Sequence, residues 1–178
     1  SGSPMEAREE AVRLAEITGI SQRMNIDYFM AALEDVYESA SGKPLSLPEL
    51  KDKIILWNAL VVLGKEQVSG LTASEMKYQR VRESGDFVLD ETVAAIYNSY
   101  GKNIYVLAGR AYIDCLLGGD NGWYQPFWSA NHRTAGLLAN YLLLKQGKKP
   151  FILTVENHRF FYCLRTYEQA EQFFFELD

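Results

Sequence analysis

The sequence predicts a mainly α protein of one domain with two small β elements. Apolar residues recur at positions i, i+3 and i+4 through most of the chain, which is the spacing of one buried helix face. Capping residues and glycines divide these stretches into segments of helical length. The chain has 178 residues, 48% of them hydrophobic, which suits one domain with a core that needs no disulfide or metal ion.

The N-terminal half is expected to be helical. Apolar residues at helical spacing predict helices over 5–19, 22–39 and 48–64, and glycines stand at the ends of the first and third. Thr72 is followed three positions later by a glutamate, the spacing of a reciprocal N-cap. A fourth helix is therefore expected to begin after Thr72.

The middle of the chain changes character. Residues 82–89 begin with turn-forming residues and end in a short β-prone run. Asp90 suits the N-cap of a helix over 91–100, and Asn103 suits that of a helix that ends at Leu117.

The C-terminal part combines a long helix with a second β element. A glycine-rich loop at 118–122 precedes a strongly apolar helix over 130–146. Two β-prone runs, at 151–155 and 159–163, flank a short polar turn and predict a β-hairpin. Thr166 begins a last short helix.

Composition excludes several classes of protein. The net charge is −5, from 18 Lys+Arg against 23 Asp+Glu, and a nucleic-acid-binding domain is usually basic. No apolar run approaches the roughly 18 residues of a membrane span. The sequence therefore predicts neither a nucleic-acid nor a membrane partner. Residues 1–4 precede Met5 and have the composition of a cloning remnant.

Cysteine and histidine are scarce. Cys115 and Cys163 each lie in an apolar stretch, and we expect both to be buried free thiols. His132 and His158 are the two histidines. No cluster with zinc-ligand spacing follows from these four residues.

One segment, 125–135, carries polar residues directly before the long apolar helix. Free N–H groups at a helix start carry partial positive charge, and Arg133 adds a permanent cation suited to phosphate. Asn131 would offer an amide to such a site, and Phe127 would anchor the loop on the core. Two plainer roles are also open: Arg133 could pair with a carboxylate such as Asp120, and Asn131 could be an ordinary helix cap.

This segment resembles the signature of the Fic/Doc (Fido) family, His-x-Phe-x-[Asp/Glu]-[Gly/Ala]-Asn-[Gly/Lys]-Arg. The corresponding positions are Gln125, Phe127, Ser129, Ala130, Asn131, His132 and Arg133. The resemblance covers about 82–151, and its Ala-Asn-x-Arg-Thr-Ala form is closer to the Doc branch. It implies a Fido-type helical bundle over 5–178, made of N-terminal helices (5–81), a Fic/Doc-like core (82–150) and a final hairpin and helix (151–178). The family's β-hairpin flap, which clamps the target, would fall at 82–89.

The resemblance also implies an activity. Fic proteins use ATP and Mg²⁺ to transfer AMP to a hydroxyl of a target protein (AMPylation), and Doc transfers a phosphate. Ser129, Ala130, Asn131 and Arg133 would then hold ATP or another phosphate-bearing co-substrate, and Phe127 would anchor the loop. The setting would be a bacterial cytoplasm, or a host cytoplasm into which a toxin or effector is delivered.

Two departures from the family pattern affect its chemistry. Gln125 replaces the histidine that acts as general base, and glutamine cannot accept that proton. Ser129 replaces the acidic magnesium ligand and is a weak ligand for a hard cation. His132 could replace Gln125 as the base, although a solvated place on the first turn is favoured, and Asp114 or Asp120 could replace the metal ligand, although a turn is more typical of Asp120. The alternative is a catalytically inactive Fido pseudoenzyme that serves as a protein-binding scaffold.

Overall fold

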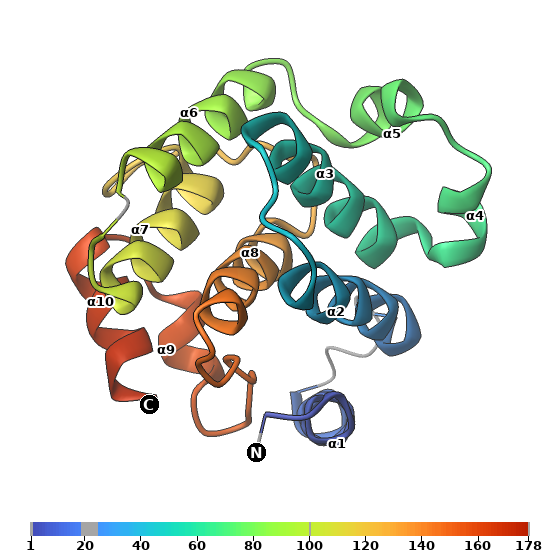
Figure 1. Cartoon of the computed structure of the whole chain (residues 1–178). Coiled ribbons are helices and arrows are strands. Elements are labelled where there is room, and N and C mark those ends of the chain that lie inside the picture. The colour runs from blue at the N-terminus through green and yellow to red at the C-terminus, as the bar shows by residue number, and fades with distance from the viewer. Residues whose placement is uncertain (1, 19–24, 100, 178) are drawn as a thin grey trace.

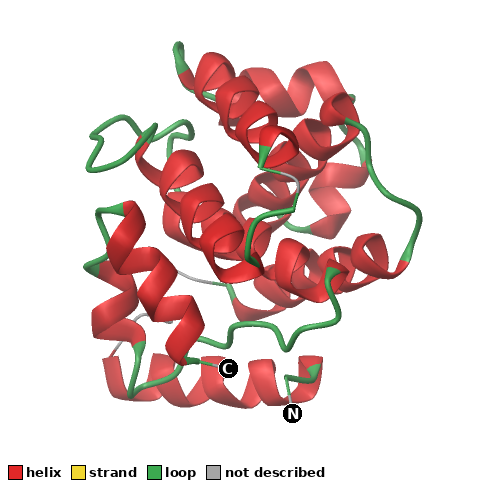
Figure 2. Ribbon diagram, turned by 60° about the vertical axis from the view of Figure 1, so that its left-hand side comes forward, coloured by secondary structure: helices red, strands yellow, loops and turns green. Residues whose placement is uncertain are grey.

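The computed structural model describes residues 2–18, 25–99 and 101–177, and this part of the chain is mainly helical, as predicted (Figures 1 and 2). Its helices are α1 (Pro4–Thr18), α2 (Ile26–Ser41), α3 (Leu47–Leu63), α4 (Lys65–Ser69), α5 (Ala73–Arg80), α6 (Gly85–Asn98), α7 (Ile104–Leu117), α8 (Asn131–Lys145), α9 (His158–Tyr162) and α10 (Tyr167–Glu176). None of these helices is long and apolar enough to cross a membrane.

Helix α8 is the centre of the core. Figure 1 shows α2 and α3 on one side of it and α7 on the other, and α8 packs against all three. Every residue of α8 from Thr134 to Leu143 is buried. A helix that is apolar on all sides is stable only when neighbours surround it, so the sequence of α8 determines its central position.

The expected helix starts are confirmed where capping residues define them. Thr72 caps α5 in a reciprocal pair with the glutamate three residues later, and Thr166 does the same at α10 with a glutamine. Ser46, for which no capping role is predicted above, caps α3 in the same way. Asn103 caps α7 through its side-chain oxygen. The expected end of the first helix at Gly19 and start of the second at Gln22 lie outside the described residues.

The predicted β element at 82–89 is wrong. Helix α6 already begins at Gly85, and Asp90, expected to be its N-cap, lies inside it. Val88 and Leu89 are buried on the helix face that also buries Val93, so burial at helical spacing outweighs the β propensity of the short run.

The predicted C-terminal hairpin at 151–163 is also wrong, because α9 occupies the place of its second strand. The backbone N–H and C=O of Phe151 bond to the side chain of Asn140 on α8, at 2.5 and 2.9 Å. The side chain of Asn157 accepts from the N–H of Thr154 and donates to the carbonyl of Ile152. Two asparagine side chains thus provide hydrogen bonds that a partner strand would have supplied.

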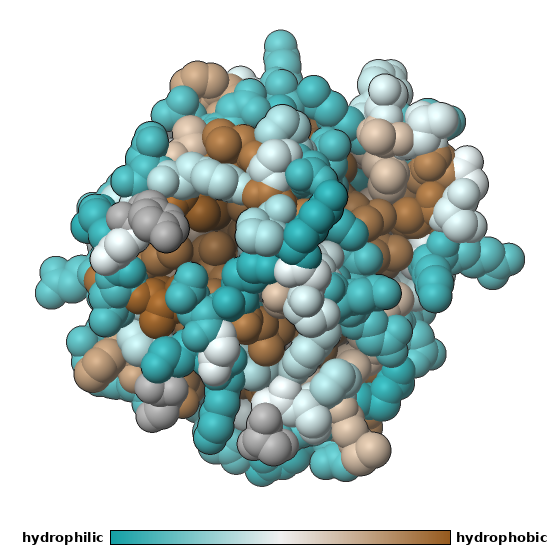
Figure 3. Space-filling view, in the orientation of Figure 1, coloured by the Kyte–Doolittle hydropathy of each residue, from teal (hydrophilic) through white to brown (hydrophobic). Residues whose placement is uncertain are grey.

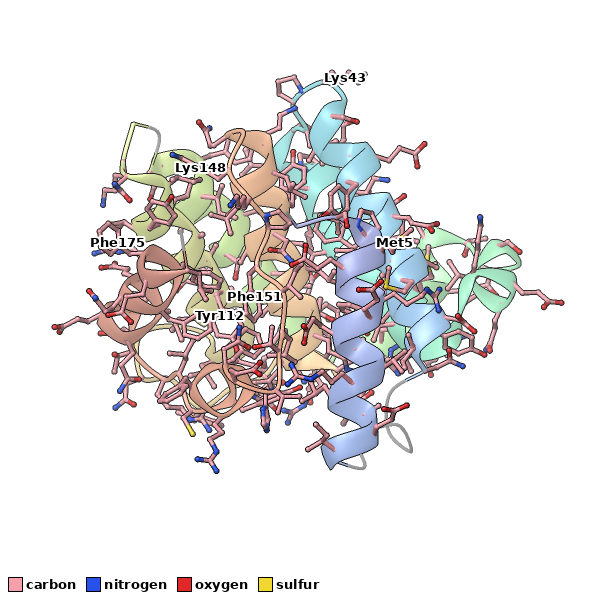
Figure 4. All side chains as sticks on the ribbon, turned by 90° about the horizontal axis from the view of Figure 1, so that it is seen from below. Met5, Lys43, Tyr112, Lys148, Phe151 and Phe175 are labelled. Atoms are coloured by element: carbon pink, nitrogen blue, oxygen red, sulfur yellow. The ribbon has the colours of Figure 1, made fainter. Side chains whose placement is uncertain are left out.

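Helices α7, α9 and α10 meet in an aromatic cluster. The ring of Phe161 lies 4.9 Å from that of Tyr112 and 4.8 Å from that of Phe151, and Phe151 also contacts Phe174. Figure 4 shows Tyr112 and Phe151 next to each other in this region. Their burial joins the last segment of the chain to α7 and α8.

The two cysteines differ from expectation in one case. Cys115 is buried, and burial raises the pKa of its thiol to about 12. Cys163 is exposed, because it directly follows the short α9 and lies at the edge of the packed cluster. The prediction of two buried thiols is therefore correct for Cys115 alone.

The surface alternates hydrophilic and apolar areas on the face seen in Figure 3. A groove of about 440 Å³ lies between α3 and α5, where Ile55, Leu56 and Met76 contribute apolar side chains.

At the N-terminal end, Pro4 begins α1, and the hydroxyl of Tyr37 donates to the carbonyl of Gly2. Residues 2–4 therefore take part in the packing.

Candidate functional site

The segment singled out in the sequence lies in the connection between α7 and α8, and the chain after α5 holds it in place. The N–H of Arg82 donates to the carbonyl of Pro126 at 2.8 Å, and the N–H of Trp128 donates to the carbonyl of Arg80 at 3.2 Å. A Cβ at Gly85 would lie 2.1 Å from the oxygen of Pro126. The close approach of α6 to this loop therefore requires a glycine.

Phe127 and Asn131 fix the conformation of the loop. Phe127 is 1% exposed and anchors the loop in the core, as predicted. Its N–H donates to Oδ1 of Asn131, and its C=O accepts from Nδ2 of Asn131, both at 2.9 Å. Both polar atoms of the buried Asn131 amide thus bond to the loop backbone. Asn131 is therefore not the N-cap of α8, which is Ala130.

Helix α8 begins without a side-chain cap. The N-cap residue is Ala130, which has φ +61° and ψ +28°, a left-handed conformation that is uncommon for a residue with a Cβ. The N–H of Thr134 donates to the carbonyl of Ala130. The preceding N–H groups, of residues 131–133, have no acceptor within the helix and point away from its first turn.

Arg133 belongs to the first turn of α8, and its side chain borders a small, mainly apolar cavity that residues of α1, α2 and the segment 151–153 also line. Its half-buried side chain makes no hydrogen bond or ion pair with any described residue, and Asp120 instead accepts from the N–H of Tyr167. The alternative role of Arg133, an ion pair with Asp120, is therefore wrong. Burial lowers the pKa of Arg133, but a guanidinium keeps its charge in proteins.

Ser129 belongs to a polar network that sequence reasoning missed. Its hydroxyl accepts from NH2 of Arg80 at 2.8 Å, and Nε of Arg80 donates to Oδ1 of Asn58 at 2.9 Å. The amide of Asn58 donates in turn to the carbonyl of Ser129 and the hydroxyl of Thr134. The signal in the sequence is Asn58 itself, a polar residue within the apolar second half of α3, residues 54–63.

These residues do not fit a magnesium ion. The hydroxyl of Ser129 bonds to a guanidinium, which would repel a cation at that position. Asp114 accepts from the hydroxyl of Tyr167, and Asp120 accepts from its N–H, so both carboxylates serve the start of α10. Over residues 2–18, 25–99 and 101–177 there is no group of three or more His, Cys, Asp or Glu that could hold a metal ion.

His132 is half-buried rather than solvated. Its ring lies 5.1 Å from that of Tyr162, and its Nε2 is buried without a hydrogen-bond partner among the described residues. Burial, with a smaller effect of Arg165, lowers the pKa of His132 to about 4. The ring is therefore neutral at pH 7.

The backbone carbonyl of Gln125 accepts from NH1 of Arg82 at 3.2 Å.

An aromatic surface borders the loop. The guanidinium of Arg82 lies 4.6 Å from the ring centre of Tyr124 and 5.5 Å from that of Trp128. Trp128 is 65% exposed, and Trp123, which packs edge-on against Tyr124, is 85% exposed. We refer to Trp123, Tyr124, Trp128 and Arg82 as the aromatic surface.

No family model matches the chain, and no curated protein or solved structure matches it.

Asn131→Ala is expected to lower the free energy of unfolding by about 2–4 kcal/mol, because it leaves the buried N–H and C=O of Phe127 without partners. Chemical denaturation measures this loss. Asn98→Ala, on the exposed end of α6, is the control. Equal stability of the two variants would contradict the role given to Asn131.

His132 is expected to make stability depend on pH. Its pKa is about 4 in the folded protein against 6.5 as the reference value, so the unfolded chain binds a proton there that the folded protein excludes. The contribution of neutral His132 is complete above pH 6.5 and is lost as the pH falls to about 4. The melting temperature of His132→Gln should therefore fall less than that of the parent over this window. Parallel curves would contradict the burial of Nε2.

Proposed function

We propose that the chain is a Fido-type protein that binds a phosphate-bearing co-substrate at the start of α8 and transfers a nucleotidyl, phosphoryl or related group from it to a protein hydroxyl. The observation that carries the proposal is Arg133 in the first turn of the uncapped α8, where it forms no ion pair with any described residue. A half-buried cation and free N–H groups together favour an anion. The match of the loop to the Fic/Doc signature supports a nucleotide as the source of that anion.

The chemistry available to this site is mainly electrostatic. Arg133 and the start of α8 would stabilise the charge that develops on the transferred group. Gln125 cannot act as a base, and loss of a general base typically slows such a reaction by about 10²–10⁴-fold. His132 is neutral at pH 7, but with a pKa of about 4 it is a weak base. The proposed transfer is therefore slow compared with that of a histidine-containing relative.

Nucleotide binding is expected to raise the melting temperature. A ligand at 100 times its dissociation constant adds about 2.7 kcal/mol of stability, which for a chain of this size is a rise of roughly 5–10 °C. The panel is ATP, GTP, CTP, UTP, nucleotide sugars and CDP-choline, each with and without Mg²⁺. Arg133→Ala should abolish the rise.

Lys65→Ala is the matched control, because it removes one exposed positive charge on α4, away from α8 (Figure 1). It should keep the full rise. No rise with any ligand, or equal losses in both variants, would contradict a phosphate site at Arg133.

A protein-binding scaffold is the second candidate, and the aromatic surface favours it. Trp123 and Trp128 expose large apolar rings beside the loop, and exposed tryptophans are typical of protein interfaces. The replacement of the base by Gln125 agrees with a protein that binds without turnover. In this case the loop would serve recognition of a protein partner.

Gln125→His distinguishes the two candidates. If the chain is a transferase limited by its missing base, this variant should label itself or proteins of a lysate with α- or γ-labelled ATP about 10²–10⁴ times faster than the parent. Gln67→His, on the exposed α4, is the control and should not differ from the parent. Absence of labelling by a variant that still binds ATP would leave the scaffold as the function.

A further inference from the structure

A pocket of about 550 Å³ lies between the last turns of α6 and α8 and the first turns of α3 and α7. Figure 3 shows apolar side chains in this hollow and hydrophilic side chains around it. The buried Leu50 and Leu142 and the half-buried Ile96, Ile104 and Leu107 form its apolar walls. Its volume is within the range of about 300–1,000 Å³ that is typical of small-molecule pockets.

Three lysines, Lys102, Lys145 and Lys148, line the same pocket. The ammonium of Lys145 donates to the carbonyl of Gly42 at 2.6 Å, and that of Lys148 lies 5.9 Å from the ring centre of Tyr105. None of the three lysines forms an ion pair with a described residue. Among the described residues that line the pocket there is no Asp or Glu. The pocket therefore combines apolar walls with positive charge that no lining carboxylate offsets.

The end of α8 places two of these lysines at the pocket. Gly147 has φ +74°, its N–H donates to the carbonyl of Leu144 at 3.0 Å, and the N–H of Lys148 donates to the carbonyl of Leu143 at 2.9 Å. These two bonds form a Schellman motif, in which a glycine in the left-handed conformation ends a helix. Lys145 precedes this turn and Lys148 follows it, and both line the pocket.

The lysines of this acidic chain are concentrated here. Lys43 and Lys149 are neighbours in sequence of lining residues, so five of the nine lysines lie at or next to the pocket. Figure 4 shows Lys43 and Lys148 in the upper part of the view. Glu49, at the start of α3, accepts from the N–H of Ser46 as its capping partner and lines the groove between α3 and α5 instead.

We propose that this pocket binds an amphipathic anion, with a single alkyl chain against the apolar walls and a carboxylate or phosphate head group at Lys102, Lys145 and Lys148. Burial of the chain would supply most of the affinity, and the ammonium groups would select an anionic head. A membrane-binding surface, by contrast, inserts protruding apolar side chains into the lipid, whereas the apolar side chains here line a hollow. The inference is independent of the proposed function, because no residue of the loop at 125–133 lines this pocket.

A ligand series tests the two halves of the site by isothermal titration. From hexanoate to octanoate and decanoate, affinity should rise by up to about fourfold per CH₂. Acetate and inorganic phosphate, which lack the chain, should not bind measurably. Decyltrimethylammonium has the same chain with a positive head and should bind at least about 10-fold more weakly than decanoate. Tighter binding of decyl phosphate than of decanoate would assign a phosphate head, and the reverse would assign a carboxylate; both support the proposal.

Two lysine substitutions test the charges. Lys102→Ala and Lys148→Ala remove exposed side chains, so both variants should fold, and each should weaken decanoate binding by about 2–5-fold. The double variant should weaken it by about 4–25-fold. Lys65→Ala, on α4, removes an exposed lysine away from the pocket and should bind as the parent does.

Ile104→Glu tests the apolar wall. Ile104 is the first residue of α7, where a glutamate suits the helix dipole, so the variant should keep the melting temperature of the parent within a few degrees. It should weaken decanoate binding by at least about 10-fold. Ile17→Glu makes the same change at an exposed position on α1 and should bind normally.

Four results would overturn the inference: no binding of decanoate or decyl phosphate, equal binding of decanoate and decyltrimethylammonium, unchanged binding by the folded Ile104→Glu variant, or equal effects of the pocket variants and their controls. Vesicles of phosphatidylglycerol provide a further comparison. Flotation of the protein with these vesicles, without binding of decanoate, would assign the lysines to a membrane surface and also overturn it. None of these outcomes bears on nucleotide binding at Arg133, which Arg133→Ala tests separately.

Discussion

The pair of hydrogen bonds between the Asn131 amide and the backbone of Phe127 is the constraint on which the rest of the site depends. It closes the loop onto the first residue of α8 and holds the Phe127 ring in the core. The closed loop places Ala130 in a left-handed conformation, so no capping side chain stands at the helix start. The same closure holds Ser129 where Arg80 and Asn58 can reach it. This buried pair of hydrogen bonds thus accompanies a helix start that has no capping side chain.

The charges around this loop are unusual for an acidic protein. The chain has a net charge of −5, yet Arg80, Arg82 and Arg133 form no ion pair with any described residue. Lys51 and Lys53, by contrast, pair with Asp86, Asp90 and Asp35 on the same bundle. Three arginines around the loop thus have no carboxylate partner among the described residues, and a local positive field of this kind attracts anions.

The parts of the fold that follow from short-range chemistry could be predicted from the sequence. Ser46, Thr72 and Thr166 each cap a helix through a residue three positions away, so their roles are visible in a window of four residues. The role of Phe127 as an anchor also follows from its local position, just before the long apolar helix. The segment at 87–89 was misassigned because tertiary burial overrides β propensity. The Arg80–Ser129 contact joins positions 49 apart in the chain, and no local pattern marks such a pair.

The two departures from the Fic/Doc signature have different physical consequences. Gln125 removes a group that can accept a proton, and nothing among its described contacts replaces that chemistry. Ser129 removes a negative charge, but next to Arg80 this loss preserves a free cation instead of forming an internal ion pair. One substitution thus weakens proton transfer while the other keeps the loop attractive to an anion. The signature residues that favour anion binding are retained, whereas the residue that would accept the proton is not. Binding and catalysis are therefore separable in this arrangement.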